Sequence, residues 1–427
     1  MLEILKNRTY RHLLMAQVIA LVGTGLATVA LGLLAYDLAG QNAGAVLGTA
    51  LAIKMAAYIG VAPIASAFAE RLPRRAMLVT LDLVRAGVAL ALPFVDQIWQ
   101  VYILIFVLQS ASAAFTPTFQ ATIPDVLTDE RDYTRALSLS RLAYDMESVI
   151  SPMLAAALLT VISFHTLFAG TVIGFLGSAA LVVSVVLPSA KAPIKRAIYE
   201  RTTRGIRIYL GTPRLRGLLV LNIAVAAAGA MVIVNTVVLV QAHFGLPQRS
   251  TALALALFGA GSMFAALTLP KFLDRWPDRP VMLGGAAVLV LGLLVGSMVT
   301  TYEQLLVLWF VLGVGYSTAQ TPSGRLLKRS SQAVDRPSLF AAQFALSHAS
   351  WLVTYPLAGW LGARIGLPPV FLILSGVAGL SVIGALLMWP ASDPDVLEHE
   401  HADGAPSGAH RHAHVFTIDD DHPRWPH

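Results

Sequence analysis

Cysteine is absent from this chain of 427 residues, and charged residues are scarce. Without thiols the chain can form no disulfide, thiolate metal site or catalytic thiol, so any bound metal must be held by nitrogen and oxygen atoms. Charged residues make up 13% of the chain and hydrophobic residues 56%, whereas an ordinary soluble domain is about 25% charged. This balance excludes a water-soluble globular protein and indicates an integral membrane protein.

The common signatures of ATP use and metalloproteolysis are also missing. The chain has no glycine-rich phosphate loop followed by Lys and Ser or Thr, and no HExxH zinc-protease motif. We therefore expect no enzymatic activity and no cofactor. The net charge of +6 does not call for a nucleic-acid partner, because positive residues of membrane proteins collect in the cytoplasmic loops.

Long apolar runs dominate what is present. A helix that crosses the roughly 30 Å hydrocarbon layer needs about 20 apolar residues, and twelve such runs stand between polar or Pro/Gly-rich segments. They lie near residues 12–38, 45–68, 77–96, 99–121, 136–160, 164–188, 217–242, 250–270, 281–300, 305–325, 339–362 and 367–389. The sequence thus predicts an all-α membrane protein with two bundles of six transmembrane helices.

The polar segments divide the chain into four parts. Residues 1–188 form the first six-helix bundle, 189–216 a polar linker with an amphipathic helix, 217–390 the second bundle, and 391–427 a histidine-rich tail. Most lysines and arginines fall in the linker and in loops on one side of the expected spans. By the positive-inside rule, that side and both termini are expected in the cytoplasm.

The two halves resemble each other. "SAFAERLPRRAML" at 66–78 aligns with "PKFLDRWPDRPVM" at 270–282, with acid, arginine and proline at a constant offset of 204. Such a six-plus-six repeat is typical of two-bundle transporters, whose binding site lies between the halves near the middle of the membrane.

Charges inside a bilayer cost roughly 2.5–3.5 kcal/mol at a helix centre, so they mark candidate functional residues. Span two holds Lys54, and span five holds Arg141, Asp145 and Glu147. Glu147 lies about 200° around the helix from Asp145, so the two acids cannot line the same cavity. We expect one of them to bind a cation or a proton, and the alternative is a salt bridge that fixes helix packing.

Span eleven holds His348, about nine residues from the expected cytoplasmic end. A neutral imidazole can bind nickel, copper, zinc or iron, and it can relay protons near neutral pH. The alternative is a packing histidine. Asp82 and Arg85, which are three residues apart in span three, are interpreted as a structural pair.

The loop after span two resembles the signature of the major facilitator superfamily. The matching residues are Ser66, Glu70, Arg71, Pro73, Arg74 and Arg75, with Ser66 and Glu70 where the family usually has Gly and Asp. The resemblance covers about residues 5–390 and implies two six-helix bundles. It also implies a gating role for Glu70, Arg71, Arg74 and Arg75, and for Asp274 and Arg275 in the mirrored loop. The alternative is that these arginines only set the topology.

A narrower resemblance suggests a substrate class. "LDLVRAG" in span three and "AAFTPTFQATIPDVL" after span four are similar to the drug and siderophore exporter branch. "SLSRLAYDMESVISPMLAAALL", "SHASWLVTYPLAGWLG" and the histidine-rich tail resemble the NreB-type nickel-resistance permeases within that branch.

The tail carries six candidate metal ligands, namely His399, His401, His410, His412, His414 and His422. Histidines that alternate with other residues fall on one side of an extended strand, and short histidine-rich tracts are typical of metal binding. The alternative is a solvated tail. The final "VFTIDDDHPRWPH" has apolar residues to bury, so we expect it to dock on the cytoplasmic face.

Together these features favour a secondary transporter of the bacterial inner (plasma) membrane. The expected activity is proton-coupled efflux of a divalent metal ion, nickel or cobalt, with Lys54, Arg141, Asp145, Glu147 and His348 on the path. The alternatives are export of a drug or siderophore-like solute, and a non-transporting metal sensor or scaffold. The expected partners are the metal ion or small-molecule substrate, protons and the lipid bilayer.

Overall fold

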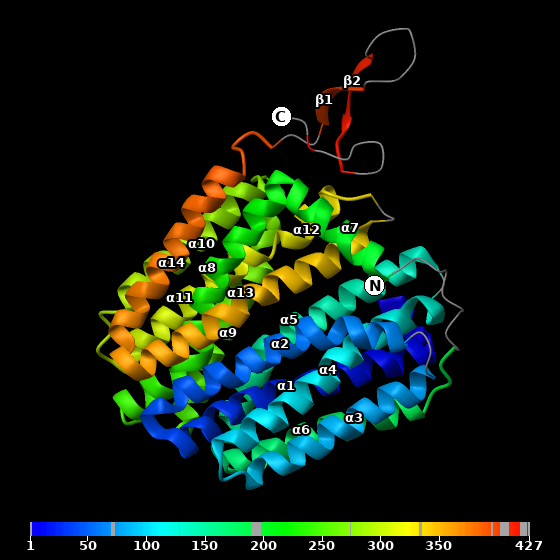
Figure 1. The fold of residues 1–427 in the computed structure, drawn as a ribbon. Helices are drawn as coiled ribbons and strands as arrows, with labels where there is room; N and C mark the ends of the chain where they lie inside the picture. Colours follow the sequence, from blue (N-terminus) through cyan, green and yellow to red (C-terminus); the bar gives the residue numbers. More distant parts are fainter. Residues whose placement is uncertain are drawn as a thin grey trace.

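The computed structural model forms two helical bundles, each built from six long helices in the part of the chain that it describes (Figure 1). It describes residues 2–69, 73–127, 129–188, 198–273, 275–332, 335–393, 396–401, 410–418 and 425. The first bundle contains α1 (Arg8–Ala39), α2 (Ala43–Ala69), α3 (Arg74–Ala91), α4 (Ile98–Val126), α5 (Glu130–Leu158) and α6 (Phe164–Val183). The second contains α8 (Pro213–Val237), α9 (Gln248–Leu273), α10 (Asp278–Gly296), α11 (Tyr302–Gln320), α13 (Arg336–Ile365) and α14 (Leu367–Met388).

Shorter elements complete the chain. They are η1 (Leu2–Lys6), η2 (Gly40–Asn42), η3 (Leu92–Phe94), α7 (Ile198–Gly211), η4 (Val238–His243), α12 (Ser323–Arg329), β1 (Val396–His401) and β2 (His410–Val415). The twelve long helices match the twelve predicted spans in order, so the predicted all-α membrane fold is confirmed. Among the described residues, nine continuous helical stretches are long and apolar enough to cross a membrane, and the first runs through α1 and α2.

The two bundles meet along two repeat-related contacts. The second helix of each half packs against the fifth helix of the other, α2 against α13 and α5 against α9. Both fifth helices carry an interior proline, Pro152 and Pro356, separated by the same offset of 204. Because proline cannot donate to the carbonyl four residues before it, each fifth helix has a local weak point at the equivalent position.

Glycine allows α2 and α13 to approach closely at one end of the bundles. A Cβ added to Gly359 would overlap the carbonyl oxygen of Gly44, and one added to Gly48 would lie 2.5 Å from that of Tyr355. Lipid tails are as apolar as leucine, so helices in a bilayer associate through such close backbone packing rather than through the hydrophobic effect.

α1 begins and α14 ends at the same face of the molecule, which we call the terminal face. α7, α12 and the β1–β2 ribbon lie there, beside the ends of the second bundle (Figure 1). α7 packs on α13, where Arg204 forms a two-pronged ion pair with Asp335 (Nε to Oδ1 2.6 Å, Nη2 to Oδ2 3.1 Å). The predicted linker helix therefore exists, and it lies against the second bundle.

The repeat is visible in ion pairs on the terminal face. Arg74 pairs with Asp125 in the first half. At the positions 204 residues later, Asp278 pairs with Arg329 (3.1 Å), and Asp278 also accepts from Arg325 Nε (2.8 Å). The same link between the third and fourth spans is thus made in both halves with the charges exchanged.

A second repeated contact lies at the end of the sixth span of each half. Arg75 donates to the carbonyl of Val183 at the end of α6. Arg279, again 204 residues later, donates to the carbonyl of Trp389 at the end of α14 (2.9 Å). Cations suit these places, because the last carbonyls of a helix lack backbone donors and carry partial negative charge.

Candidate functional site: a charged chain between the bundles

Lys54 lies on α2 and lines a small cavity inside the first bundle. The cavity has about 20 Å³ of space, which is room for about one water molecule. Its other polar lining comes from Thr24 and Thr28 on α1 and from Gln109 and Ser112 on α4. The half-buried side chain of Lys54 therefore has polar neighbours in a cavity whose remaining lining is apolar.

Glu147 faces α1 from α5. A Cβ added to Gly25 of α1 would lie 2.6 Å from Glu147 Oε1 and would overlap the side chain of Ser151. The absence of a side chain at Gly25 is therefore what lets the carboxylate sit against α1. Glu147 of the fifth span and Lys54 of the second have opposite charges and lie within electrostatic range of each other in the first bundle.

His348 lies on α13, and its ring stacks on Tyr58 of α2 (centroids 5.6 Å apart, planes 12° apart). The ring of Phe344 lies against it at a tilt (centroids 3.9 Å apart, planes 33° apart). Nδ1 of His348 is 2.6 Å from the carbonyl oxygen of Phe344. A carbonyl oxygen only accepts hydrogen bonds, so Nδ1 carries the proton. In the neutral ring Nε2 is then left with a lone pair for a proton or a metal ion.

Lys54 also interacts electrostatically with His348, and Tyr58 stands one helical turn from Lys54 on α2. Lys54 thus lies within electrostatic range of both Glu147 and His348. The first two belong to one bundle and the third to the other.

Two predicted members of the path are not placed by this geometry. Arg141 and Asp145 lie on α5, but their side chains are outside the described part of the structure. Their backbone positions agree with the prediction that they share one face of α5 and that Glu147 lies on another. Their roles stay predictions.

Tyr58 and Phe344 were missed by sequence reasoning, which searched for charges. A search for polar residues one turn from each membrane charge would have found Tyr58, four residues after Lys54. Phe344 carries no comparable signal, because it acts through its backbone carbonyl and an aromatic ring.

The predicted pair in span three is confirmed as a buried ion pair, Asp82 with Arg85. The guanidinium of Arg85 lies between the rings of Phe115 and Phe175, 4.1 and 4.5 Å from their centroids. These cation–π contacts and the carboxylate compensate the buried charge, which agrees with a structural role.

The predicted gating loops are described only in part. Glu70, Arg71 and Asp274 lie outside the described residues, and Arg275 is exposed. Arg74 and Arg75 make the contacts reported above within the first bundle. A gating role for these loops stays a prediction.

The tail histidines fall on a two-stranded antiparallel ribbon. The register pairs His399 with His412 and His401 with His410, and it places His414 opposite Leu397. Directly paired residues of antiparallel strands share a face, as do residues two apart along one strand. All five histidine positions therefore belong to one face of the ribbon, as the alternating pattern predicts for each strand.

No group of three or more potential ligands is arranged for a metal ion among the side chains that the structure describes. The side chains of the five ribbon histidines, and the whole of His422, lie outside that part of the structure. The backbone register of the ribbon is therefore the observation that bears on metal binding.

The segment after the ribbon is docked, as its apolar residues predict. Phe416, Thr417 and Ile418 are buried, and the ring of Phe416 meets that of Trp425 edge-on (5.2 Å, 78°). This segment lies against the second bundle on the terminal face.

Comparisons with known proteins agree with this architecture. The sequence profile of the Major Facilitator Superfamily matches the chain over residues 13–269 and 218–417. YfiS of Bacillus subtilis (strain 168), an uncharacterized transporter of the same type, is 23% identical over 349 residues, which are 76% of this chain and 81% of YfiS.

Solved structures show the same fold. A bacterial homolog of the human lysosomal transporter Spinster, inward-facing and occupied, matches with a TM-score of 0.71 and 11% identity, over 89% of this chain and 96% of that one. A D-xylose–proton symporter matches with a TM-score of 0.64 and 14% identity, over 91% and 97%. The chain therefore belongs to the major facilitator superfamily, and it is a secondary transporter rather than an enzyme.

Proposed function

We propose that the chain exports a divalent metal ion, nickel or cobalt, from the cytoplasm across the bacterial inner membrane in exchange for protons. The terminal face then faces the cytoplasm, which agrees with the arginines gathered there. The observation that carries the choice of substrate is the register of the β1–β2 ribbon, which puts five histidine positions on one face.

Cross-strand neighbours have Cβ atoms about 4.5–5.5 Å apart, close enough for two imidazoles to share one ion. Two such pairs follow each other along the ribbon, His399 with His412 and His401 with His410. In a chain without cysteine, imidazole is the ligand that suits nickel, cobalt, copper or zinc. The ribbon captures the ion at the cytoplasmic face, before the ion enters the path between the bundles.

Glu147, Lys54 and His348 couple the movement of protons to the movement of the metal ion. While Glu147 is ionised it attracts the ammonium of Lys54, and Nε2 of His348 is available to bind the cation. A proton that reaches Glu147 from outside removes that attraction, so the positive charge of Lys54 acts on the cation at His348 and expels it. Proton entry and cation exit are thus linked through one lysine.

Flux measurements with purified protein in liposomes test this proposal. With an acidic interior, protons leave and drive nickel or cobalt inward through the molecules whose terminal face is outside. Glu147→Gln removes the proton site, so we expect it to abolish the gradient-dependent part of the flux. We expect His348→Ala to raise the half-saturating metal concentration.

The matched control is Glu303→Gln, which removes an exposed acid at the start of α11, and it should leave the flux unchanged. Gradient-driven flux of an organic cation, with none for nickel or cobalt, would contradict the choice of metal. Equal loss of flux in the Glu147 and Glu303 variants would contradict the coupling role.

A second candidate, export of a drug or siderophore-like solute, is favoured by one observation. Tyr58, Phe344 and His348 form an aromatic cluster between α2 and α13, and flat organic molecules stack well on such rings. The same liposomes, tested with organic cations, distinguish the two substrates. No observation favours the third reading, a non-transporting metal sensor.

A further inference from the structure

The docked end of the chain contains Phe416, Thr417, Ile418 and Trp425, which we call the docking segment. Phe416 is 2% exposed and Ile418 is 3% exposed, although both follow directly after a ribbon that stands away from the bundles (Figure 1). Burial this complete indicates a specific intramolecular binding site for the segment.

That site is the junction of α7 and α8, which we call the elbow. Ile418 fits where α7 ends in a glycine, because a Cβ added to Gly211 would lie 2.6 Å from Ile418 Cδ1. The ring of Trp425 lies under the guanidinium of Arg214 at the start of α8, at 5.3 Å. A glycine and a cation thus shape the two ends of the site.

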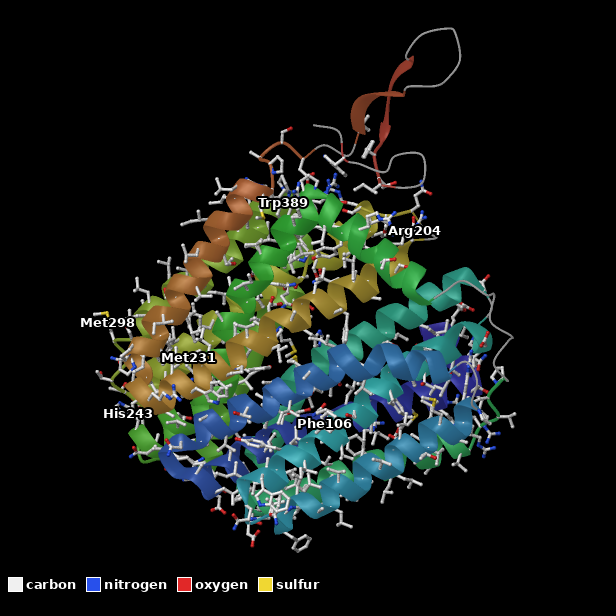
Figure 2. The ribbon with its side chains drawn as sticks, viewed as in Figure 1. Phe106, Arg204, Met231, His243, Met298 and Trp389 are labelled. Atoms are coloured by element: carbon white, nitrogen blue, oxygen red, sulfur yellow. The ribbon has the colours of Figure 1, made fainter. Side chains whose placement is uncertain are left out.

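Arg214 is held in place from the other side. It is 1% exposed, and its Nε lies 3.0 Å from Asp393 Oδ1. Trp389 Nε1 donates to the second oxygen of Asp393 (3.1 Å). Figure 2 labels Trp389 at this end of the second bundle, beneath the ribbon. The elbow, the end of α14 and the docking segment therefore share one network.

Both ends of the ribbon are anchored in this network. Asp393 comes shortly before β1, and Phe416 follows directly after β2. Anchoring both ends removes much of the entropy cost of bringing β1 and β2 together. A metal ion held between the strands would remove part of the same cost.

The elbow also reaches the transport path. On α7, Arg204 pairs with Asp335, and the hydroxyl of Tyr209 donates to Gln343 Oε1 on α13. Figure 2 labels Arg204 on the terminal face, near the ribbon. Burial raises the pKa of Tyr209 above its ordinary value, so the phenol remains a donor at physiological pH. α13 is the helix that carries His348.

We propose that the ribbon and the docking segment form a metal-sensitive latch, in which metal on the histidine face and docking on the elbow stabilise each other. This inference rests on the proposed function for the metal that the ribbon binds. Coupling of this kind is reciprocal, so metal must strengthen docking by the same factor by which docking strengthens metal binding. A substitution that displaces the docking segment must therefore weaken metal binding.

The test displaces the docking segment without touching a histidine. Gly211→Leu places a side chain where Ile418 lies, and Gly211→Leu with Ile418→Ala makes room for it again. Gly324→Leu is the control, because Gly324 has open space around it on α12. Hydrogen exchange at residues 416–418 measures docking, and calorimetry with nickel measures binding to the full-length protein in detergent.

We expect Gly211→Leu to speed exchange at 416–418 and to raise the Kd for nickel about 5- to 50-fold, within the usual range of allosteric coupling. The double variant should recover both properties, and Gly324→Leu should change neither. In the unsubstituted protein, nickel should slow exchange at 416–418.

Faster exchange in Gly211→Leu with an unchanged Kd would overturn the latch, as would unchanged exchange in that variant. Failure of the proposed function looks different. The protein could bind nickel with the expected coupling and show no gradient-driven nickel flux in liposomes. In that case the latch proposal stands and the exporter proposal fails.

Discussion

At the scale of single residues, the candidate site was predicted from charged and ionisable residues that are costly to place in a membrane. Lys54, Glu147 and His348 are conspicuous in apolar spans, since each must gain enough from a partner to offset its transfer cost. Their partners were hidden, because Gly25, Tyr58 and the carbonyl of Phe344 carry no charge. Only the packing of α1, α2 and α13 brings these groups to the charges.

Gly25 gives a residue-scale prediction. In Gly25→Ala the new methyl group collides with Ser151 and approaches Glu147 Oε1, so α1 and α5 must separate. We expect about 1–3 kcal/mol of destabilisation, the usual cost of overpacking, together with reduced gradient-driven flux. Thermal unfolding and liposome flux measure the two effects.

Two further variants make this prediction specific. Gly60→Ala on α2 is the control, because a Cβ there meets nothing within 4 Å, and it should behave like the parent protein. Gly25→Ala with Ser151→Gly removes the nearest obstacle and should recover stability. A double variant as unstable as the single one would refute the assigned collision.

At the scale of elements, the two halves share contacts that a sequence repeat alone does not reveal. Arg75 and Arg279 each donate to a carbonyl at the end of the sixth span of their half. Pro152 and Pro356 lie at equivalent positions inside the two fifth helices. These agreements arise because both bundles have the same helix packing, which places equivalent positions against equivalent partners.

The exchanged ion pair gives a prediction at this scale. The second half makes its link with acid and base in the opposite order, so the first half should tolerate the exchange. We expect Arg74→Asp alone to lower the melting temperature, since it puts two acids together, and Arg74→Asp with Asp125→Arg to restore it. A double-mutant cycle should give a coupling energy on the order of 1–3 kcal/mol.

Asp125→Arg alone completes that cycle and should be as damaging as the first single variant. If the stability losses of the two single variants simply add in the double variant, Arg74 and Asp125 do not stabilise each other. The exchanged pair would then not restore the contact.

At the scale of the molecule, transport requires the two bundles to move against each other around the site between them. On the face opposite the terminal face, α2 and α13 are joined by Gly44, Gly48 and Gly359, and Trp360 Nε1 donates to Thr49 Oγ1 (2.9 Å). Opening on that side must separate these contacts.

A cross-link between two introduced cysteines tests this requirement. No native cysteine has to be removed first, because the chain contains none. We expect Thr49→Cys with Trp360→Cys, joined by a short bifunctional thiol reagent, to lose flux and to keep metal binding at the ribbon. Cleavage of a reducible reagent should restore transport.

The matched control joins two positions within one bundle. Ser250→Cys with Tyr302→Cys links α9 to α11, where the hydroxyl of Tyr302 donates to the carbonyl of Ser250 (2.8 Å), and flux should continue. Equal inhibition by both cross-links would argue against relative motion of the bundles at α2 and α13.

The sequence by itself determined that the protein lies in a lipid membrane, how many long helices it has, and that its two halves repeat. Each of these follows from local properties, because a span must be apolar along its length and the repeated loops share residues at a constant spacing. The alternation of histidines likewise placed those of each strand on one side, since side chains alternate along any extended chain.

Only the tertiary structure decided which residues meet. It brought Lys54 within electrostatic range of Glu147 and His348, paired the histidines across β1 and β2, and placed Ile418 against Gly211. These contacts join residues far apart in the chain, and they depend on the packing of whole helices. Local patterns cannot encode that packing, because many partners would satisfy the same charge or apolar surface.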